Sequence, residues 1–168
     1  MKRMLKGFSP KLQPVLGPLF ELSHSKLRLC DIGVNIMDEM FHGEYHHKQV
    51  HENDIHLLLE RAKSMGVSSM IMTGSCIKNS QQTLDFCKLH ETEHELYCTA
   101  GIHPCSSEVF KTQGSAIVIE NLKKVLDDGL ASGHLVAFGE CGLDYDRLHY
   151  CDRETQLLGK LRSSFVSS

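Results

Sequence analysis

The chain has 168 residues, of which 41% are hydrophobic and 23% are charged. This length and composition predict one globular domain with a sizeable core, and they exclude a disordered chain. The formal net charge of −3 argues against a partner held by a broad basic surface. A nuclease stays compatible with that charge, because a metal ion can neutralise a phosphate where a row of lysines is lacking.

The amino-terminal segment differs from the rest of the chain. Residues 1–30 contain six Lys or Arg and one acid, and Pro10, Pro14 and Pro18 interrupt any long helix. We expect a basic, loosely ordered extension over residues 1–28, with an organellar transit peptide as the alternative, and one domain over residues 29–168. No secretory signal or membrane-length apolar run is seen. The seven cysteines are therefore expected to be reduced, in a nuclear or cytoplasmic protein without a membrane partner.

Strand and helix signals alternate from Leu27 onward. Apolar runs at 27–35, 67–74, 95–101 and 134–140 each reach a glycine near their end and predict strands. Residues 53–66, 80–90, 115–128 and 152–162 predict helices, with Asn53 and Asn79 as caps and Gly66 and Gly129 as stops. About four βα units indicate an α/β fold with a parallel sheet covered by helices. The pattern alone allows half a barrel or an open sheet.

Polar residues cluster where the predicted strands end. Asn35, His103 and Glu140 each follow a strand-end glycine closely. The carboxyl ends of parallel strands share one rim, where α/β proteins build their sites. The alternative is that glycine and polar residues serve only the turns after the strands.

The segment at residues 136–149 carries the strongest chemical signal. Glu140 leaves an apolar strand with no Lys or Arg beside it, and Asp144 and Asp146 follow within six positions. A carboxylate in this setting must find a partner, shift its pKa or bind a cation. A cluster of oxygen ligands is typical of hard divalent cations, which often serve phosphoryl chemistry.

Four segments together resemble the TatD family of metal-dependent deoxyribonucleases, within the amidohydrolase-like barrel superfamily. They are DIGVN at 31–35, MTGS at 72–75, TAGIHP at 99–104 and VAFGECGLDYDR at 136–147. The resemblance spans about residues 29–158, the amino-terminal half of a typical member. It implies the first half of a TIM-like (β/α) barrel and divalent-metal-dependent hydrolysis of DNA.

The resemblance also implies roles for individual residues. Glu140 matches a bridging metal ligand and is the expected catalytic and metal-binding residue. His103, Asp144 and Asn35 are expected to bind substrate, and Asn35 could also ligate through its amide oxygen. Met37 stands where many relatives place a histidine, and its thioether is a poor ligand for a hard cation. Full-length relatives are expected to hold two metal ions, and Mg, Mn and Zn are not distinguished.

The family draws further ligands from strands beyond this chain, so we expect weak or absent DNA cleavage. The alternative function is a non-catalytic truncated isoform that binds or interferes with the full-length enzyme. Half a barrel exposes two sheet edges, which predicts self-association or pairing through them.

Several other patterns are interpreted as structural. HETEH at 90–94 matches a zinc-protease motif but is expected to be a solvated helix end. The histidines at 42, 46, 47 and 51 are expected in a surface loop, and the eleven-residue spacing of Cys76, Cys87 and Cys98 to be coincidental. Cys141 is expected to pack inward, because strand alternation would turn it away from Glu140.

Overall fold

The computed structural model of the protein describes residues 28–91 and 95–164. The predicted basic extension lies outside these residues, apart from Arg28. Within the described residues no helix combines the length and the apolar character that crossing a bilayer requires.

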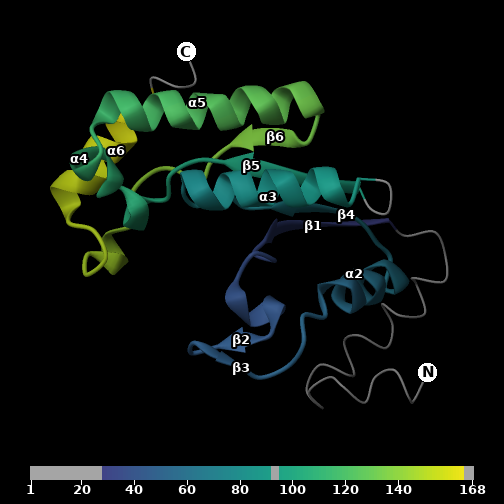
Figure 1. Ribbon diagram of the computed structural model, residues 1–168. Helices are drawn as coiled ribbons and strands as arrows, with labels where there is room; N and C mark the ends of the chain where they lie inside the picture. The colour runs from purple at the N-terminus through teal and green to yellow at the C-terminus, as the bar shows by residue number, and fades with distance from the viewer. Residues whose placement is uncertain (1–27, 92–94, 165–168) are drawn as a thin grey trace.

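Four parallel strands form the central sheet (Figure 1). They are β1 (Leu29–Val34), β4 (Val67–Met72), β5 (Glu95–Ala100) and β6 (Leu135–Phe138), and they lie in the order β1-β4-β5-β6. Strands adjacent along the chain are thus adjacent in the sheet, which is the arrangement of successive units in a (β/α) barrel. The predicted α/β class and parallel sheet are confirmed, and the strand order favours half a barrel over an open sheet.

Four helices fall where the sequence predicts them. They are α2 (Ile55–Ser64), α3 (Ile77–Leu89), α5 (Ser115–Ser132) and α6 (Arg153–Ser163). The sequence did not predict the hairpin of β2 (Glu44–Tyr45) and β3 (Lys48–Gln49), nor the short helix α4 (Val109–Thr112). It also missed three 3-10 turns, η2 (Glu39–His42), η3 (Pro104–Ser106) and η4 (Tyr145–Arg147). These short elements lie mostly after the carboxyl ends of β1, β5 and β6.

The helix starts differ in part from the prediction. Asn53 accepts a hydrogen bond from the backbone N–H of Ile55 at 3.1 Å, so its side chain does support the start of α2. Asn79 does not cap α3. Cys76 holds the cap position, and the amide oxygen of Asn79 accepts instead from the backbone N–H of Ser75 at 3.0 Å. Asn79 therefore anchors the loop after β4.

The predicted stop at Gly129 is wrong. The helix α5 continues to Ser132 and ends at Gly133, whose φ of 76° is left-handed. Gly129 is buried inside α5, where an added Cβ would lie 2.7 Å from the Cβ of Leu135 in β6. This glycine lets the helix approach the sheet closely instead of ending the helix.

The core lies between the sheet and the helices. It includes Met70 and Met72 of β4, Leu84 of α3, and Leu96 of β5, all 5% exposed or less. The other face of the sheet is open at its edge strands, where Ile32 is 73% exposed and Val136 is 48% exposed. Helices thus bury one face of the sheet, as on the outside of a barrel.

All seven cysteines are free thiols, as predicted. Two of the three evenly spaced cysteines, Cys87 and Cys98, contact each other because α3 packs on β5. The hydrogen bond between Cys87 and Cys98, together with burial, raises the pKa of the Cys87 thiol. Cys76 caps α3, so the eleven-residue spacing does not assemble a three-cysteine site.

Candidate active site

Backbone hydrogen bonds join the loops after β4, β5 and β6 into one rim. The N–H of His103 donates to the carbonyl of Ser75 at 2.9 Å, and the N–H of Glu140 donates to the carbonyl of Gly74 at 3.0 Å. The N–H of Gly139 donates to the carbonyl of Ala100 at 2.9 Å. Residues more than 60 positions apart therefore meet at the carboxyl ends of the strands, as the sequence predicts.

Gly101 permits the closest approach within this rim. A Cβ built at Gly101 would lie 2.5 Å from the backbone oxygen of Glu140 and 2.6 Å from the carbonyl carbon of Gly139. Any side chain there would displace the backbone that presents Glu140. This glycine serves close packing of the site, so the turn-only interpretation fails here.

An open hollow of ≈ 450 Å³ lies at this rim. His103 and Pro104 line it from the loop after β5, and Phe138 lines it from the end of β6. Residues of the segment after β6 complete it: Gly139, Glu140, Cys141, Leu143 and Asp144. Three of the four predicted site residues therefore share one cavity. The hollow lies at the carboxyl ends of β5 and β6.

Glu140 is exposed at the rim and is not buried in the core. No Lys, Arg or His within the described ranges lies at ion-pair distance from its carboxylate. A carboxylate in this position is available to a cation or to a ligand that enters the hollow.

Asp144 is half-buried and held by α6. Its backbone N–H donates to the Gln156 amide oxygen, and its carbonyl accepts from the Gln156 amide nitrogen, both at 2.8 Å. Gln156 is fully buried and also donates to the carbonyl of Cys151 at 3.0 Å. One carboxylate oxygen of Asp144, Oδ2, accepts from Arg147 at 3.1 Å. The loop is thus fixed by a buried side chain that the sequence analysis did not single out.

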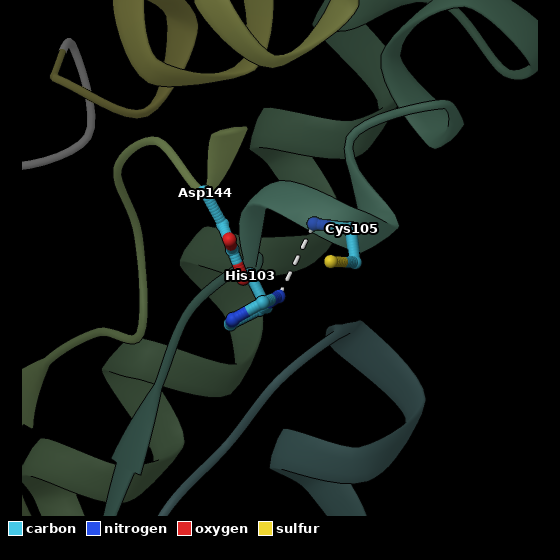
Figure 2. Close-up of side chains that lie close together, drawn as sticks. All are labelled: His103, Cys105 and Asp144. Carbon is cyan, nitrogen blue, oxygen red and sulfur yellow. Dashed lines mark hydrogen bonds between the residues drawn. The ribbon is translucent and has the colours of Figure 1, made fainter. Parts of the chain in front are cut away.

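His103 is half-buried at the start of η3. Its Nδ1 accepts a hydrogen bond from the backbone N–H of Cys105 at 3.1 Å (Figure 2). This bond assigns a lone pair to Nδ1, so the neutral ring carries its proton on Nε2. His103 can therefore donate a hydrogen bond to an acceptor in the hollow.

A ring nitrogen of His103, the sulfur of Cys105 and a carboxylate oxygen of Asp144 all lie within 4.8 Å of one another. In Figure 2 the side chains of Asp144 and Cys105 approach His103 from two different loops. Sequence analysis missed Cys105, although it follows the G-I-H-P segment directly. A second group of ligand atoms, from Glu39, Glu44 and His47, lies in the exposed loop after β1.

Asn35 does not line the hollow. It is exposed just beyond β1, where its carbonyl accepts from the N–H of Asp38 at 3.1 Å. The end of β1 neighbours that of β4, with the N–H of Thr73 bonded to the carbonyl of Val34, whereas the hollow lies at β5 and β6. Met37 packs against the core, in keeping with a residue that does not bind metal.

The prediction for Cys141 is wrong. This cysteine is exposed and lines the same hollow as Glu140. The strand β6 ends at Phe138, so strand alternation does not extend to residues 140 and 141 and does not turn Cys141 inward.

The two histidine patterns lie outside the hollow in the described residues. The HETEH segment extends beyond the described residues after Glu91, whose carboxylate contacts His134 at 3.3 Å, so its interpretation as a solvated helix end stays a prediction. The histidines at 46 and 47 form the turn of the β2–β3 hairpin, and His42 lies against Asn53 at 3.1 Å. The predicted surface loop is confirmed.

Comparisons with known proteins agree on one family. The sequence model for TatD related DNases matches residues 31–158. The chain is 41% identical over 133 residues to "Deoxyribonuclease Tat-D" of Schizosaccharomyces pombe, which covers 77% of this chain and 41% of that protein. It is 33% identical over 130 residues to "3'-5' ssDNA/RNA exonuclease TatD" of Erwinia tasmaniensis, with 76% and 41% covered.

Solved structures give the same result for the fold. The crystal structure of a hydrolase TatD family protein from Entamoeba histolytica superposes with a TM-score of 0.74 at 33% identity. The superposed region covers 83% of this chain and 45% of the Entamoeba histolytica protein. The chain therefore spans somewhat under half the length of these relatives.

Proposed function

We propose, because the chain belongs to the family of TatD related DNases, that its hollow is part of a site for metal-dependent hydrolysis of DNA phosphodiester bonds. The observation that carries the proposal is the convergence of Glu140, His103 and Asp144 on one open hollow at the ends of β5 and β6. The matching relatives are a deoxyribonuclease and an exonuclease by name. The names of these relatives thus support a nucleic acid substrate.

The residues of the hollow fit a divalent cation. Glu140 offers an exposed carboxylate with no ion-pair partner among the described residues, and Asp144, whose Oδ2 accepts from Arg147, lines the same hollow. Carboxylate oxygens are the ligands that hard divalent ions prefer. A bound ion there would polarise a phosphoryl oxygen and lower the pKa of a bound water.

Each side chain of the site has a different proposed role. Glu140 holds the metal ion, and the Nε2–H of His103 donates to a phosphate oxygen. Asp144 positions the substrate from the loop that Gln156 fixes. Asn35 is proposed to contact substrate further along the rim, at the end of β1. Glu140, His103 and Asp144 line the hollow, and Asn35 follows β1 at the same end of the parallel sheet.

We expect cleavage by this chain to be slow. A cation gains affinity from several protein ligands in fixed geometry, and in the described residues the hollow presents few carboxylates around Glu140. Weak metal binding lowers the fraction of active protein without changing the chemistry.

Cleavage of end-labelled single-stranded DNA with added Mg²⁺ or Mn²⁺ tests the proposal. We expect metal-dependent cleavage that falls about 100-fold or more in Glu140→Ala, because removal of a group that stabilises transition-state charge has effects of that order. The control is Glu120→Ala, an exposed glutamate on α5 that pairs with Lys124. Equal cleavage by the parent and Glu140→Ala, in preparations free of contaminating nuclease, would contradict the proposal.

One observation favours the second candidate, a non-catalytic partner of a longer relative. The sheet face opposite the helices exposes Ile32 and Val136, and exposed apolar surface of this kind is typical of interaction sites. Sizing the protein at several concentrations, with Ile32→Ser as the matched variant, separates the candidates. Self-association that Ile32→Ser abolishes supports the partner role, and a concentration-independent monomer speaks against it.

A further inference from the structure

Three side chains in the loops after β5 and β6 offer a set of ligands that differs from a site made of carboxylates alone. A ring nitrogen of His103, the sulfur of Cys105 and a carboxylate oxygen of Asp144 lie within 4.8 Å of one another. In a tetrahedral zinc site the bond lengths place neighbouring ligand atoms roughly 3.3–3.8 Å apart. Shifts of roughly 1 Å would bring the three atoms to that spacing.

We infer that His103, Cys105 and Asp144 form a binding site for Zn²⁺, with a fourth position open to water from the hollow. Glu140 is not one of the three ligands. Two of the ligands, His103 and Asp144, line the same hollow as Glu140. The inference concerns metal binding alone and holds whether or not the chain cleaves DNA.

The chemistry of the donors selects the metal. Thiolate and imidazole ligands favour zinc and similar transition metals, whereas Mg²⁺ and Ca²⁺ prefer sites made of oxygen alone. Three protein ligands with one water are the usual arrangement of zinc sites that keep an open position. Arg147 contacts one oxygen of Asp144, Oδ2, and the other oxygen can face the ion.

The backbone holds these ligands in place before any ion arrives. His103 is the N-cap of η3 and Cys105 lies inside that turn, so two ligands share one short rigid element. The third comes from the loop that the buried Gln156 clamps through both backbone groups of Asp144. Ligands fixed in this way lose little conformational freedom on binding a metal ion.

Metal binding has one local cost. The lone pair of His103 Nδ1 accepts the N–H of Cys105 in the present structure, and an ion bound at Nδ1 would replace that hydrogen bond. One neutral hydrogen bond is weak beside coordination by a thiolate and an imidazole. The backbone amide of Cys105 should therefore report binding directly.

Titration of the reduced protein with Co²⁺, a spectroscopic substitute for Zn²⁺, tests the site. We expect one equivalent to give a tetrahedral d–d spectrum with a thiolate-to-cobalt charge-transfer band, which Zn²⁺ abolishes by displacement. Cys105→Ser should remove the charge-transfer band, and Asp144→Asn should weaken Co²⁺ binding about tenfold or more. Cys141→Ser is the matched control, because Cys141 is exposed in the same hollow but lies outside the ligand set, and its spectrum should match the parent.

A second measurement avoids variants that fail to fold. Zn²⁺ should slow alkylation of Cys105 in the unaltered chain about tenfold or more, since the coordinated thiolate is no longer a free nucleophile, and mass spectrometry locates the modified residue. Alkylation of Cys141 should stay unchanged, and Mg²⁺ should protect neither cysteine. A charge-transfer band that persists in Cys105→Ser, or Cys105 alkylation that is insensitive to Zn²⁺, would overturn the inference.

Discussion

Different kinds of contact stabilise the rim formed by the loops after β4, β5 and β6 and the loop that carries Asp144. Around β4, β5 and β6, backbone groups bond to backbone groups, and Gly101 allows the chains to touch. The loop that carries Asp144 is held by the side-chain amide of Gln156 in α6, and the carboxylate of Asp152 caps the start of that helix. The first arrangement relies mainly on backbone groups and on Gly101, with support from the Asn79 side chain at the N–H of Ser75, whereas the second depends on two particular side chains.

The largest expected effect comes from Gly101→Ala. The added Cβ would meet backbone atoms of residues 139 and 140 at 2.5–2.6 Å, and backbone cannot move aside as a flexible side chain can. We expect a loss of about 3 kcal/mol or more in the free energy of unfolding, measured by urea denaturation.

Gly114→Ala is the control for that substitution. Gly114 has a φ of +85° with a ψ of 136°, and nothing lies within 4 Å of an added Cβ, so only backbone strain acts, at about 1–3 kcal/mol. Gly101 is not among the glycines with positive φ, so a free energy of unfolding unchanged by Gly101→Ala would show that close contact at the rim contributes nothing.

Gln156→Ala should have the next largest effect. The substitution leaves the backbone N–H and carbonyl of Asp144 without their buried partner, and a lost buried hydrogen-bond partner costs about 1–3 kcal/mol. Amide hydrogen exchange should accelerate at Asp144 and stay unchanged at Glu140, whose N–H bonds to the carbonyl of Gly74. Faster exchange at both positions would mean that the loop and the rim form one unit.

The smallest effect is expected at Asp152, through pH. Hydrogen bonds from the hydroxyl and backbone N–H of Thr155, with further support from Lys111, hold the pKa of this carboxyl well below its usual range. A lowered pKa in the folded state contributes stability that is present above the ordinary carboxyl pKa of about 4 and is lost as the pH falls toward the folded-state value.

Asp152→Asn removes that titration but keeps an acceptor for the N–H of Thr155. Denaturation midpoints at neutral and acidic pH should therefore differ less in Asp152→Asn than in the parent. Asp127→Asn, at an exposed position on α5, provides the control. A pH dependence unaltered by Asp152→Asn would show that Asp152 does not take part in the acid response.

The sequence predicted the parts that depend on apolar periodicity. The four strands and four long helices follow from such runs, and the strand-end position of Glu140 and His103 follows from the parallel sheet. The hairpin at residues 44–49 was missed because its turn uses His46 and His47 at positive φ, and histidine gives no strong turn signal.

The site was predicted less completely than the fold, for a physical reason. Gln156 and Cys105 act through contacts with residues that the fold brings near, and neither contact has a period in the sequence. Asn35 was grouped with Glu140 because both follow strands, but the hollow lies at β5 and β6 only. Cys141 was misplaced because alternation was extended past the end of β6 at Phe138.

The ion pair between Arg28 and Glu95 lies at the amino ends of β1 and β5, with 2.7 Å between its charged atoms. These ends are at the opposite edge of the sheet from the hollow, since the strands are parallel. A fluorescent reporter or an immobilising tether attached at that edge would leave the hollow free for nucleic acid. Single-molecule or surface-capture assays of this chain can therefore be anchored there without masking Glu140, His103 and Asp144.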